Sequence, residues 1–245
     1  MKDLHVNAAQ IISSVQERGF ALVRGVIDQA RAAQYLAALD AIYAKRDDTN
    51  GDVLPNDFAA ESGLTLNGLF DNQVLTAAAR RMLGPTMPVL STFMSVGKQK
   101  AIPGISLHTD GLIQGTKYLT LTMWAPLHDC GVDAPGLIVV PGSTEQVLRY
   151  LRTKFPGKRL PGWSSGAEWN DGAFDLDALR AEFGEPLFPV MAPGDVMVFT
   201  NWTIHGSNVR PGMEKRRSAA ILRLRPAPRF FKLRAWLYRV RQRHL

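Results

Sequence analysis

The five residues Leu107-His108-Thr109-Asp110-Gly111 (LHTDG) decide how the rest of this chain is interpreted. The chain has five histidines, and one of them lies two residues before an aspartate. In an extended strand, residues i and i+2 point to the same face, so His108 and Asp110 would direct an imidazole and a carboxylate to one place. Such a pair is either a hydrogen-bonded pair or part of a metal site, and the rest of the chain has to decide between the two.

His205, at the end of the stretch GDVMVFTNWTIH, can complete a metal site. Two histidines and one carboxylate hold non-heme Fe(II) by one face and leave three positions open for a co-substrate and O2. Zinc accepts the same three ligands. An H-x-D pattern also arises by chance, so two ordinary core or loop histidines are the alternative interpretation.

A strand predicted in KRRSAAILRL follows His205 and carries several arginines. Its apolar face contains Ala220, Leu222 and Leu224, and its other face contains Arg223 and Arg225. The same alternation places Arg216 and Ser218 on the apolar face, which we expect to point inward. A buried guanidinium needs an anionic partner, and it can bind a carboxylate through two parallel hydrogen bonds. Arg217 would point outward, unless a bulge reverses the two neighbours.

The composition indicates a single globular domain over residues 1–245, since the chain has 245 residues and is 46% hydrophobic. The first residues contain no apolar run typical of a signal peptide, and no apolar run is long enough to cross a bilayer. We therefore expect a cytoplasmic protein. Cys130 is the only cysteine, which excludes a disulfide within the chain and a cysteine zinc cluster.

Helical signals dominate residues 1–90, and strand signals follow them. Asn7 and Asp28 are plausible caps of helices over residues 8–18 and 29–46, and a third helix is predicted over 72–83. Residues 47–57 are predicted to form a loop. Short strands between Gly and Pro turns are predicted over residues 20–27, 88–100, 116–129, 136–143, 194–205 and 216–226. This order favours a β-barrel or sandwich that is wrapped by helices.

Two segments lie outside this pattern. Residues 145–185 form a long insertion, with a second helix capped by Asp175, and long insertions are usually functional lids or variable surface excursions. Residues 226–245 form a basic tail and contribute much of the formal net charge of +7. The tail is either a solvated helix that closes the domain or a contact for an anionic membrane surface or an acidic protein. No nucleic-acid partner is expected.

Taken together, these motifs resemble the phytanoyl-CoA dioxygenase family of Fe(II)- and 2-oxoglutarate-dependent oxygenases. The resemblance covers most of the chain and includes GFALVRGVID, LHTDG, LTLTMWAPLHD, PGLIVVPGST and PGDVMVF…IHGSNV…RRSA. It implies a mainly β fold, with a double-stranded β-helix (a cupin-like jelly roll) as the core and N-terminal helices packed outside.

The resemblance also implies the roles of individual residues. The Fe(II) ligands would be His108, Asp110 and His205, with 2-oxoglutarate and O2 as co-substrates. The residues implied to hold 2-oxoglutarate are Arg216, with Arg217 as the fallback, together with Ser218 and Trp124. The candidates for substrate contact are Lys98 and Lys100, on the strand before His108, and Trp163 and Trp169, in the insertion.

The implied reaction is hydroxylation of an unactivated C–H bond in a small molecule, with release of succinate and CO2. Secondary metabolites, amino acids and acyl or carrier-linked molecules are candidate substrates, and the basic chain favours an anionic one. The carboxylate of Asp110 argues against halogenation, because halogenating relatives have a small residue there. Desaturation, epoxidation and cyclisation would use the same residues. A catalytically silent jelly roll that binds a metal or ligand and a zinc hydrolase are the alternatives from other classes.

Overall fold

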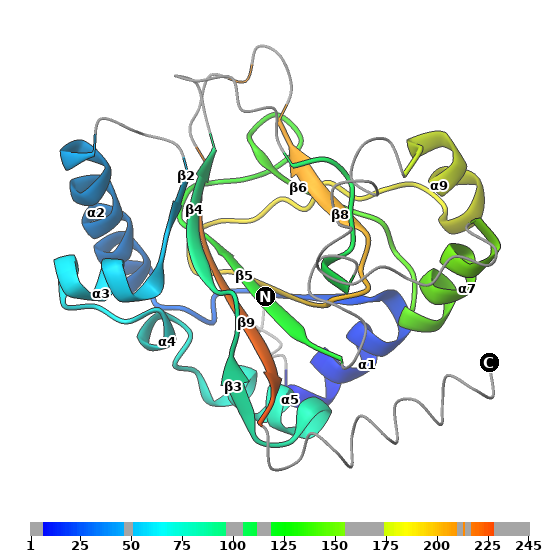
Figure 1. Cartoon of the computed structure of the whole chain (residues 1–245), viewed down its shortest axis with the longest axis horizontal. Coiled ribbons are helices and arrows are strands. Elements are labelled where there is room, and N and C mark those ends of the chain that lie inside the picture. Colours follow the sequence, from blue (N-terminus) through cyan, green and yellow to red (C-terminus); the bar gives the residue numbers. More distant parts are fainter. Residues whose placement is uncertain are drawn as a thin grey trace, which may run out of the picture.

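The computed structural model describes residues 7–46, 51–96, 105–111, 119–154, 174–209, 213 and 217–227. These residues form one antiparallel sheet of seven strands and a second sheet of two strands (Figure 1). The strand-rich part lies in the middle, with helices on its outside. This arrangement is the helix-wrapped sandwich that the sequence predicts.

The large sheet has the strand order β1-β7-β5-β9-β4-β2, with β3 paired to β9. Its strands are β1 (Phe20–Val23), β2 (Gly51–Val53), β3 (Thr86–Pro88), β4 (Thr92–Val96), β5 (Leu121–Pro126), β7 (Val196–Thr200) and β9 (Arg217–Pro226). Strand β9 pairs with β5 on one side and with β4 on the other, which places Trp124 opposite Ile221 and Phe93 opposite Ala220. All side chains of β5 are buried, because both faces of the sheet are covered.

The small sheet consists of β6 (Gly136–Val139) and β8 (His205–Asn208). Isolated bridges add Leu187 beside Val139 and His108 beside His205. We call the volume between the two sheets the inter-sheet space. The apolar side chains that meet there come from the large sheet (Trp124, Met197, Phe199, Ala219 and Ile221) and from the small sheet (Leu137 and Val139).

The helices of the N-terminal part cover the other face of the large sheet (Figure 1). They are α1 (Ala8–Arg18), α2 (Gln29–Lys45), α3 (Pro55–Ser62), α4 (Leu66–Leu69) and α5 (Gln73–Leu83). Asn7 caps α1, Asp28 caps α2 and Asn72 caps α5, each through a side-chain oxygen that accepts backbone N–H groups of the first turn. The predicted starts of these helices are therefore confirmed.

Residues 47–57, which were predicted to be a loop, contain regular structure where the chain is described. Strand β2 pairs with β4, and Val53 is buried opposite Phe93. Helix α3 starts directly afterwards with Pro55 in its first turn, a position where proline lacks no needed hydrogen bond. Strand β2 has only three residues and lies among turn-forming residues. This is why the sequence predicted neither β2 nor α3.

Helices α7 (Thr144–Lys154) and α9 (Leu176–Phe183) are the described ends of the predicted insertion. They lie side by side in Figure 1, and the rings of Tyr150 and Phe183 meet edge to face at 5.3 Å. Both helices pack on a cluster that contains Trp202 and Ile204, next to the start of β8. The cap predicted at Asp175 is confirmed, since its carboxylate accepts the N–H of Ala178 at 2.9 Å.

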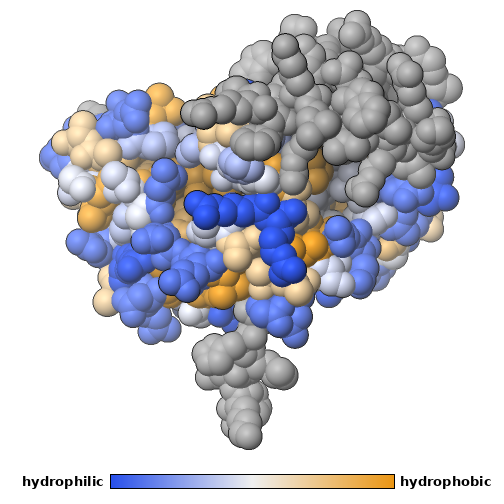
Figure 2. All heavy atoms as spheres, turned by 90° about the horizontal axis from the view of Figure 1, so that it is seen from below, coloured by the Kyte–Doolittle hydropathy of each residue, from blue (hydrophilic) through white to orange (hydrophobic). Residues whose placement is uncertain are grey.

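The surface seen in Figure 2 carries hydrophilic residues over much of its described area, with hydrophobic residues between them. Among the helices of the described residues, none combines the length and the apolar character needed to cross a membrane.

Candidate active site

His108 and His205 lie directly opposite each other, although they are far apart in the sequence. Their backbones form two reciprocal hydrogen bonds, of 2.8 Å from the N–H of His108 and 3.0 Å from the N–H of His205. Their rings are 4.4 Å apart, and both residues are buried. The ring of His205 also lies 4.6 Å from the ring of Phe199, which places the pair at the inter-sheet space.

The hydrogen bonds of the two rings define which nitrogen is available to a metal. Nδ1 of His108 lies 2.8 Å from the carbonyl oxygen of Ser106, and Nδ1 of His205 lies 2.9 Å from that of Thr203. A carbonyl oxygen only accepts, so each Nδ1 carries a hydrogen and Nε2 is the nitrogen of each ring that is left for a metal. Burial, followed by the nearby His108, lowers the pKa of His205 to about 4, so this ring is neutral at pH 7.

Asp110 completes the group, but it does so from a different backbone conformation than the predicted extended strand. The chain is extended at His108 and becomes helical at Asp110. The side chains still converge: one ligand atom from each of His108, Asp110 and His205 lies within 4.8 Å of the others. Two imidazoles and a carboxylate form the donor set that suits non-heme iron, so these residues fit the metal that the sequence implies.

The carboxylate of Asp110 is buried and strongly hydrogen-bonded. Its Oδ2 accepts the hydroxyl of Thr122 at 3.1 Å and Nε of Arg223 at 3.2 Å. Burial alone would raise the pKa of Asp110, but Arg223, His205 and His108 hold it well below its ordinary value. Asp110 is therefore an anion at neutral pH, as a metal ligand must be.

The end of the LHTDG stretch has a steric reason for its glycine. The N–H of Gly111 donates to the carbonyl of Asn201. A Cβ at this position would lie 2.9 Å from the ring of Trp202, which is fully buried. The absence of a Cβ at Gly111 lets the chain pass close to this ring directly after Asp110.

One face of strand β9 was predicted to point outward. In the structure, this face points into the inter-sheet space. Ala219 and Ile221 pack in the inter-sheet cluster, whereas Ala220, Leu222 and Leu224 pack against the N-terminal helices. The apolar alternation therefore marks contact with the helices and not with the site. By this register Arg217 and Arg223 belong to the face that looks into the inter-sheet space, and the prediction that placed Arg217 and Arg223 outward is wrong.

Arg217 has the environment of an anion-binding residue. It is 2% exposed, its Nη1 donates to the carbonyl of Gly136 at 2.8 Å, and its guanidinium carbon lies 5.6 Å from the ring centroid of Trp124. Its Nε is buried and has no hydrogen-bond partner within the described part of the chain. Burial lowers the pKa of Arg217 to about 10, so it remains a cation at neutral pH. A buried cation with a free donor fits a carboxylate such as that of 2-oxoglutarate.

Three residues are neighbours of Arg217 in the sequence or in space. Trp124 lies in the inter-sheet cluster, and its role at 2-oxoglutarate stays a prediction. Ser218 lies on the face of β9 opposite to that of Arg217, where its hydroxyl is 2.7 Å from that of Ser95, and its predicted role at 2-oxoglutarate stays a prediction. Cys130 had no predicted role, but it is buried in the same cluster as Trp124, and burial raises the pKa of its thiol to about 12.

Some predicted site residues fall outside the described residues, and their roles stay predictions. They are Arg216, Lys98, Lys100, Trp163 and Trp169. Arg223 is a site residue that the sequence reasoning missed. Its spacing from Arg217 on one face of β9 was the available signal, once the correct face of the strand is known.

A comparison with protein families identifies the family of this chain. The family model described as phytanoyl-CoA dioxygenase (PhyH) matches residues 15–217. The chain belongs to the phytanoyl-CoA dioxygenase family. Family membership and the His-Asp-His group together identify it as a non-heme iron, 2-oxoglutarate-dependent enzyme that uses O2 as co-substrate.

Solved structures of similar fold include enzymes with iron or 2-oxoglutarate bound. The epimerase SnoN, in complex with Fe3+, alpha ketoglutarate and nogalamycin RO, matches 90% of this chain and 84% of its own, with a TM-score of 0.67 and 17% identity. EctD from S. alaskensis, with 2-oxoglutarate and 5-hydroxyectoine, matches 92% and 78%, with a TM-score of 0.62 and 19% identity. EvdO2 from Micromonospora carbonacea var. aurantiaca, complexed with 2-oxoglutarate, matches 91% and 95%, with a TM-score of 0.61 and 15% identity. The predicted double-stranded β-helix is thereby confirmed. No protein of curated function matches the chain.

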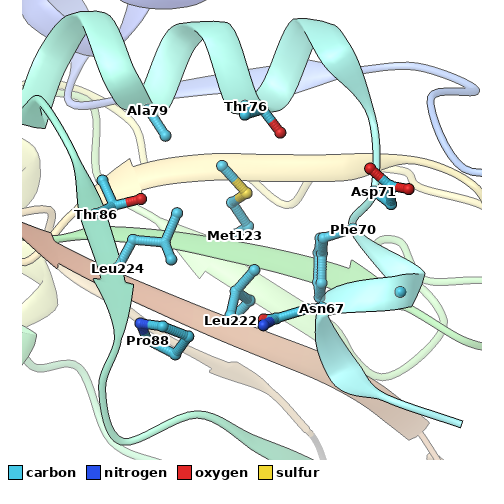
Figure 3. Close-up of a pocket in the computed structure, with 11 residues that line it drawn as sticks. Asn67, Phe70, Asp71, Thr76, Ala79, Thr86, Pro88, Met123, Leu222 and Leu224 are labelled. Carbon is cyan, nitrogen blue, oxygen red and sulfur yellow. The ribbon is translucent and has the colours of Figure 1, made fainter.

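A cavity of about 400 Å³ lies on the opposite face of the large sheet (Figure 3). Its apolar floor is formed by Met123, Leu222 and Leu224, and α4 and α5 supply part of its wall. These floor residues belong to the cluster under the N-terminal helices, so the sheet separates this cavity from the inter-sheet space.

Proposed function

We propose that this enzyme hydroxylates an unactivated C–H bond of a small molecule and converts 2-oxoglutarate and O2 to succinate and CO2. The observation that carries the proposal is the combination of two features in one inter-sheet space. One is the buried group of His108, Asp110 and His205, and the other is the buried, incompletely paired Arg217 on the facing sheet. A silent ligand-binding module would have no need for both.

Each residue then has one task. His108 and His205 offer Nε2, and Asp110 offers a carboxylate oxygen, so that three protein donors hold the iron. Iron held in this way supplies the activation of O2 that C–H oxidation requires. Arg217 would bind the far carboxylate of 2-oxoglutarate, while the ring of Trp124 packs against the guanidinium. This orientation is the protein's main contribution, because fixing a reactant lowers the barrier through entropy that binding has already lost.

Arg217 replaces Arg216 as our preferred 2-oxoglutarate residue. The sequence favoured Arg216 because it assumed that the apolar face of β9 points to the site. The described part of β9 has the opposite orientation, with Ala219 and Ile221 in the inter-sheet cluster. Ser218, on the face that packs against the helices, is not part of the proposed clamp.

The substrate class is proposed more coarsely. The structures of SnoN and EctD contain nogalamycin RO and 5-hydroxyectoine, which are small molecules, and we propose a small-molecule substrate here as well. The formal net charge of +7 favours an anionic or carrier-linked molecule. Residues 145–185 are proposed to cover the site as a lid, since their described ends, α7 and α9, pack beside the start of β8.

The first experiment measures turnover. Purified enzyme is supplied with Fe(II), 2-oxoglutarate and O2, and succinate is quantified for the wild type and for His108→Ala. We expect slow, substrate-independent succinate formation that the substitution abolishes. A screen of small anionic metabolites and acyl thioesters for faster 2-oxoglutarate consumption then identifies the substrate. If the wild type forms no succinate and binds neither iron nor 2-oxoglutarate, the chain is a silent jelly roll; activity that needs no O2 would indicate a zinc hydrolase.

The second experiment compares the two neighbouring arginines. We expect Arg217→Ala to raise the KM for 2-oxoglutarate by about 100-fold or more, in line with the loss of a bidentate, charge-assisted contact of about 3 kcal/mol. Arg216→Ala is the matched control and should change the KM far less. Thermal unfolding of both variants separates loss of binding from loss of fold. A larger effect of Arg216→Ala would return 2-oxoglutarate to the residue that the sequence favoured.

A further inference from the structure

Arg223 contacts Asp110, one of the three proposed iron ligands. It lies on the same face of β9 as Arg217, six residues further along the strand (223 − 217 = 6). Its Nε is 3.2 Å from Oδ2 of Asp110, and the side chains of Arg223 and Asp110 are only 15% and 3% exposed. The ion pair is therefore shielded from water. A charge pair in such a shielded place is stronger than one on the surface.

The segment before β4 fixes Arg223 from the other side. The carbonyl of Leu90 accepts Nη1 of Arg223 at 2.7 Å, and the N–H of Val89 donates to the carbonyl of Arg223 at 2.9 Å. Ser91 Oγ accepts the N–H of Arg223 at 3.0 Å. Leu90 has a φ of +45° and is 49% exposed, so a bulky residue holds an unfavourable backbone conformation without the reward of burial. Such strain persists only where the surroundings determine it, and here it places a carbonyl on the guanidinium.

These contacts leave the two oxygens of Asp110 unequal. Oδ2 accepts both Thr122 Oγ1 and Arg223 Nε, whereas Oδ1 faces the ring of His108, 3.8 Å from its Nε2. A carboxylate can hold a metal through one oxygen or through both. With Oδ2 already engaged by two donors, Oδ1 is the oxygen left for the metal.

We propose that Arg223 is a positioning residue, which together with Thr122 makes Asp110 a one-oxygen ligand of the iron. The proposal rests on the proposed role of Asp110 as an iron ligand. Its consequence is that Asp110 occupies one coordination position and leaves room for 2-oxoglutarate and O2. Groups that hold metal ligands in this way typically change metal affinity by about 10- to 100-fold when they are replaced.

The direction in which Arg223→Gln changes metal affinity distinguishes a positioning role of Arg223 from a simple effect of its charge. Arg223 also brings a positive charge near a cation, so charge removal alone would make Arg223→Gln bind metal more tightly. Positioning predicts the opposite, namely weaker binding by about 10- to 100-fold. Arg223→Lys keeps the charge but cannot donate to Asp110 and to Leu90 from two separate nitrogens, as Nε and Nη1 of Arg223 do. It should therefore bind metal more weakly than the wild type as well.

The test is titration of the metal-free enzyme with Mn(II), followed by electron paramagnetic resonance of the free ion. We expect Arg223→Gln to lose affinity about 10- to 100-fold and Thr122→Val to lose less. Arg81→Gln, an exposed charge-matched control on α5, should behave as the wild type. Absorption of the Co(II)-loaded enzyme, which depends on coordination number, should differ between Arg223→Gln and the wild type. Unchanged or tighter Mn(II) binding with an unchanged Co(II) spectrum would overturn the proposal.

A double-mutant cycle distinguishes failure of the positioning role of Arg223 from failure of the ligand role of Asp110. In an Asp110→Ala background, Arg223→Gln should no longer affect Mn(II) affinity, because the carboxylate that it positions is gone. If Asp110→Ala itself leaves Mn(II) affinity unchanged, the assignment of the ligand fails, and with it the proposed function. If Asp110→Ala abolishes binding while Arg223→Gln lowers only the thermal stability, the ligand assignment stands and the positioning role is refuted.

Discussion

Thr109 lies between two of the proposed iron ligands in the sequence, and its side chain is fully buried. Its hydroxyl has no hydrogen-bond partner among the described residues. An unpaired buried hydroxyl costs about 1–3 kcal/mol, so the hydroxyl itself is not a source of stability. Size, and not polarity, is what this position requires.

We therefore expect Thr109→Val, which keeps the shape of the side chain, to leave the free energy of unfolding unchanged or to raise it by up to about 1 kcal/mol. Denaturant unfolding of the metal-free protein measures this change. Thr122→Val is the contrasting variant, because its hydroxyl donates to Asp110 and should be missed. A loss of more than about 1 kcal/mol for Thr109→Val would mean that the hydroxyl has a partner beyond the described residues.

At Gly111, in contrast to Thr109, we expect a small substitution to lower the stability. Gly111→Ala would place a methyl group 2.9 Å from the ring of Trp202 and 3.0 Å from the carbonyl oxygen of Asn201. Overpacking of this kind costs about 1–3 kcal/mol, and the shift of the backbone should also move Asp110 and weaken Mn(II) binding. Unfolding and metal titration measure the two effects. Gly131→Ala is the matched control, since its nearest contact is at an ordinary 3.4 Å; equal behaviour of the two variants would contradict the steric argument.

Among the helices, α5 has a cap with a second function. Oδ1 of Asn72 accepts the N–H groups of Val74 and Leu75, and its Nδ2 donates to the carbonyl of Val26 at 2.9 Å. The same side chain thus starts a helix and fixes the chain that follows β1. Asn7 caps α1 in a similar way but is exposed.

We expect Asn72→Ala to lower the free energy of unfolding by about 2 kcal/mol, because it removes the cap and the contact to Val26. Asn7→Ala should cost about 1 kcal/mol or less, since only a cap is lost. Both values come from urea unfolding followed by circular dichroism. Equal losses would show that the contact with Val26 contributes nothing.

Local signals made these elements predictable from the sequence, and non-local packing hid the rest. The caps at Asn7, Asp28 and Asp175 depend only on residues in the next turn, and all three helices start where predicted. In β9, by contrast, both faces are buried, so Ala220 and Leu222 under the helices cannot be distinguished from Ala219 and Ile221 at the site by hydrophobicity alone. That ambiguity is why Arg216 was preferred to Arg217.

At the scale of the whole molecule, the metal site joins parts that no single element connects. His205 starts β8 in the small sheet, His108 bridges to it, and Asp110 is bonded to the large sheet through Thr122 and Arg223. The sequence predicted these three ligands through motifs that are specific when taken together, although the H-x-D pattern alone is not. The lid role of residues 145–185 and the role of the tail over 226–245 stay predictions.

Because a ligand that binds only the folded state stabilises it, Mn(II) and 2-oxoglutarate should raise the melting temperature in two steps. At 100 times its dissociation constant each ligand adds about 2.7 kcal/mol, which differential scanning fluorimetry detects as a shift of several degrees. Arg217→Ala should keep the Mn(II) step and lose the 2-oxoglutarate step. His205→Ala should lose both, and a 2-oxoglutarate step that survives in Arg217→Ala would contradict the assigned anion site.

The reciprocal hydrogen bonds between His108 and His205 have a consequence for the order of events during folding. The backbone groups of His108 and His205 bring these two residues together from distant parts of the chain. The entropy cost of closing the loop between them therefore falls on formation of the sheet and not on metal binding. The apoprotein should therefore keep its ligands at coordinating distance. Iron would then bind late in folding, to a site that is already formed. Chelators should remove the iron without unfolding the two sheets.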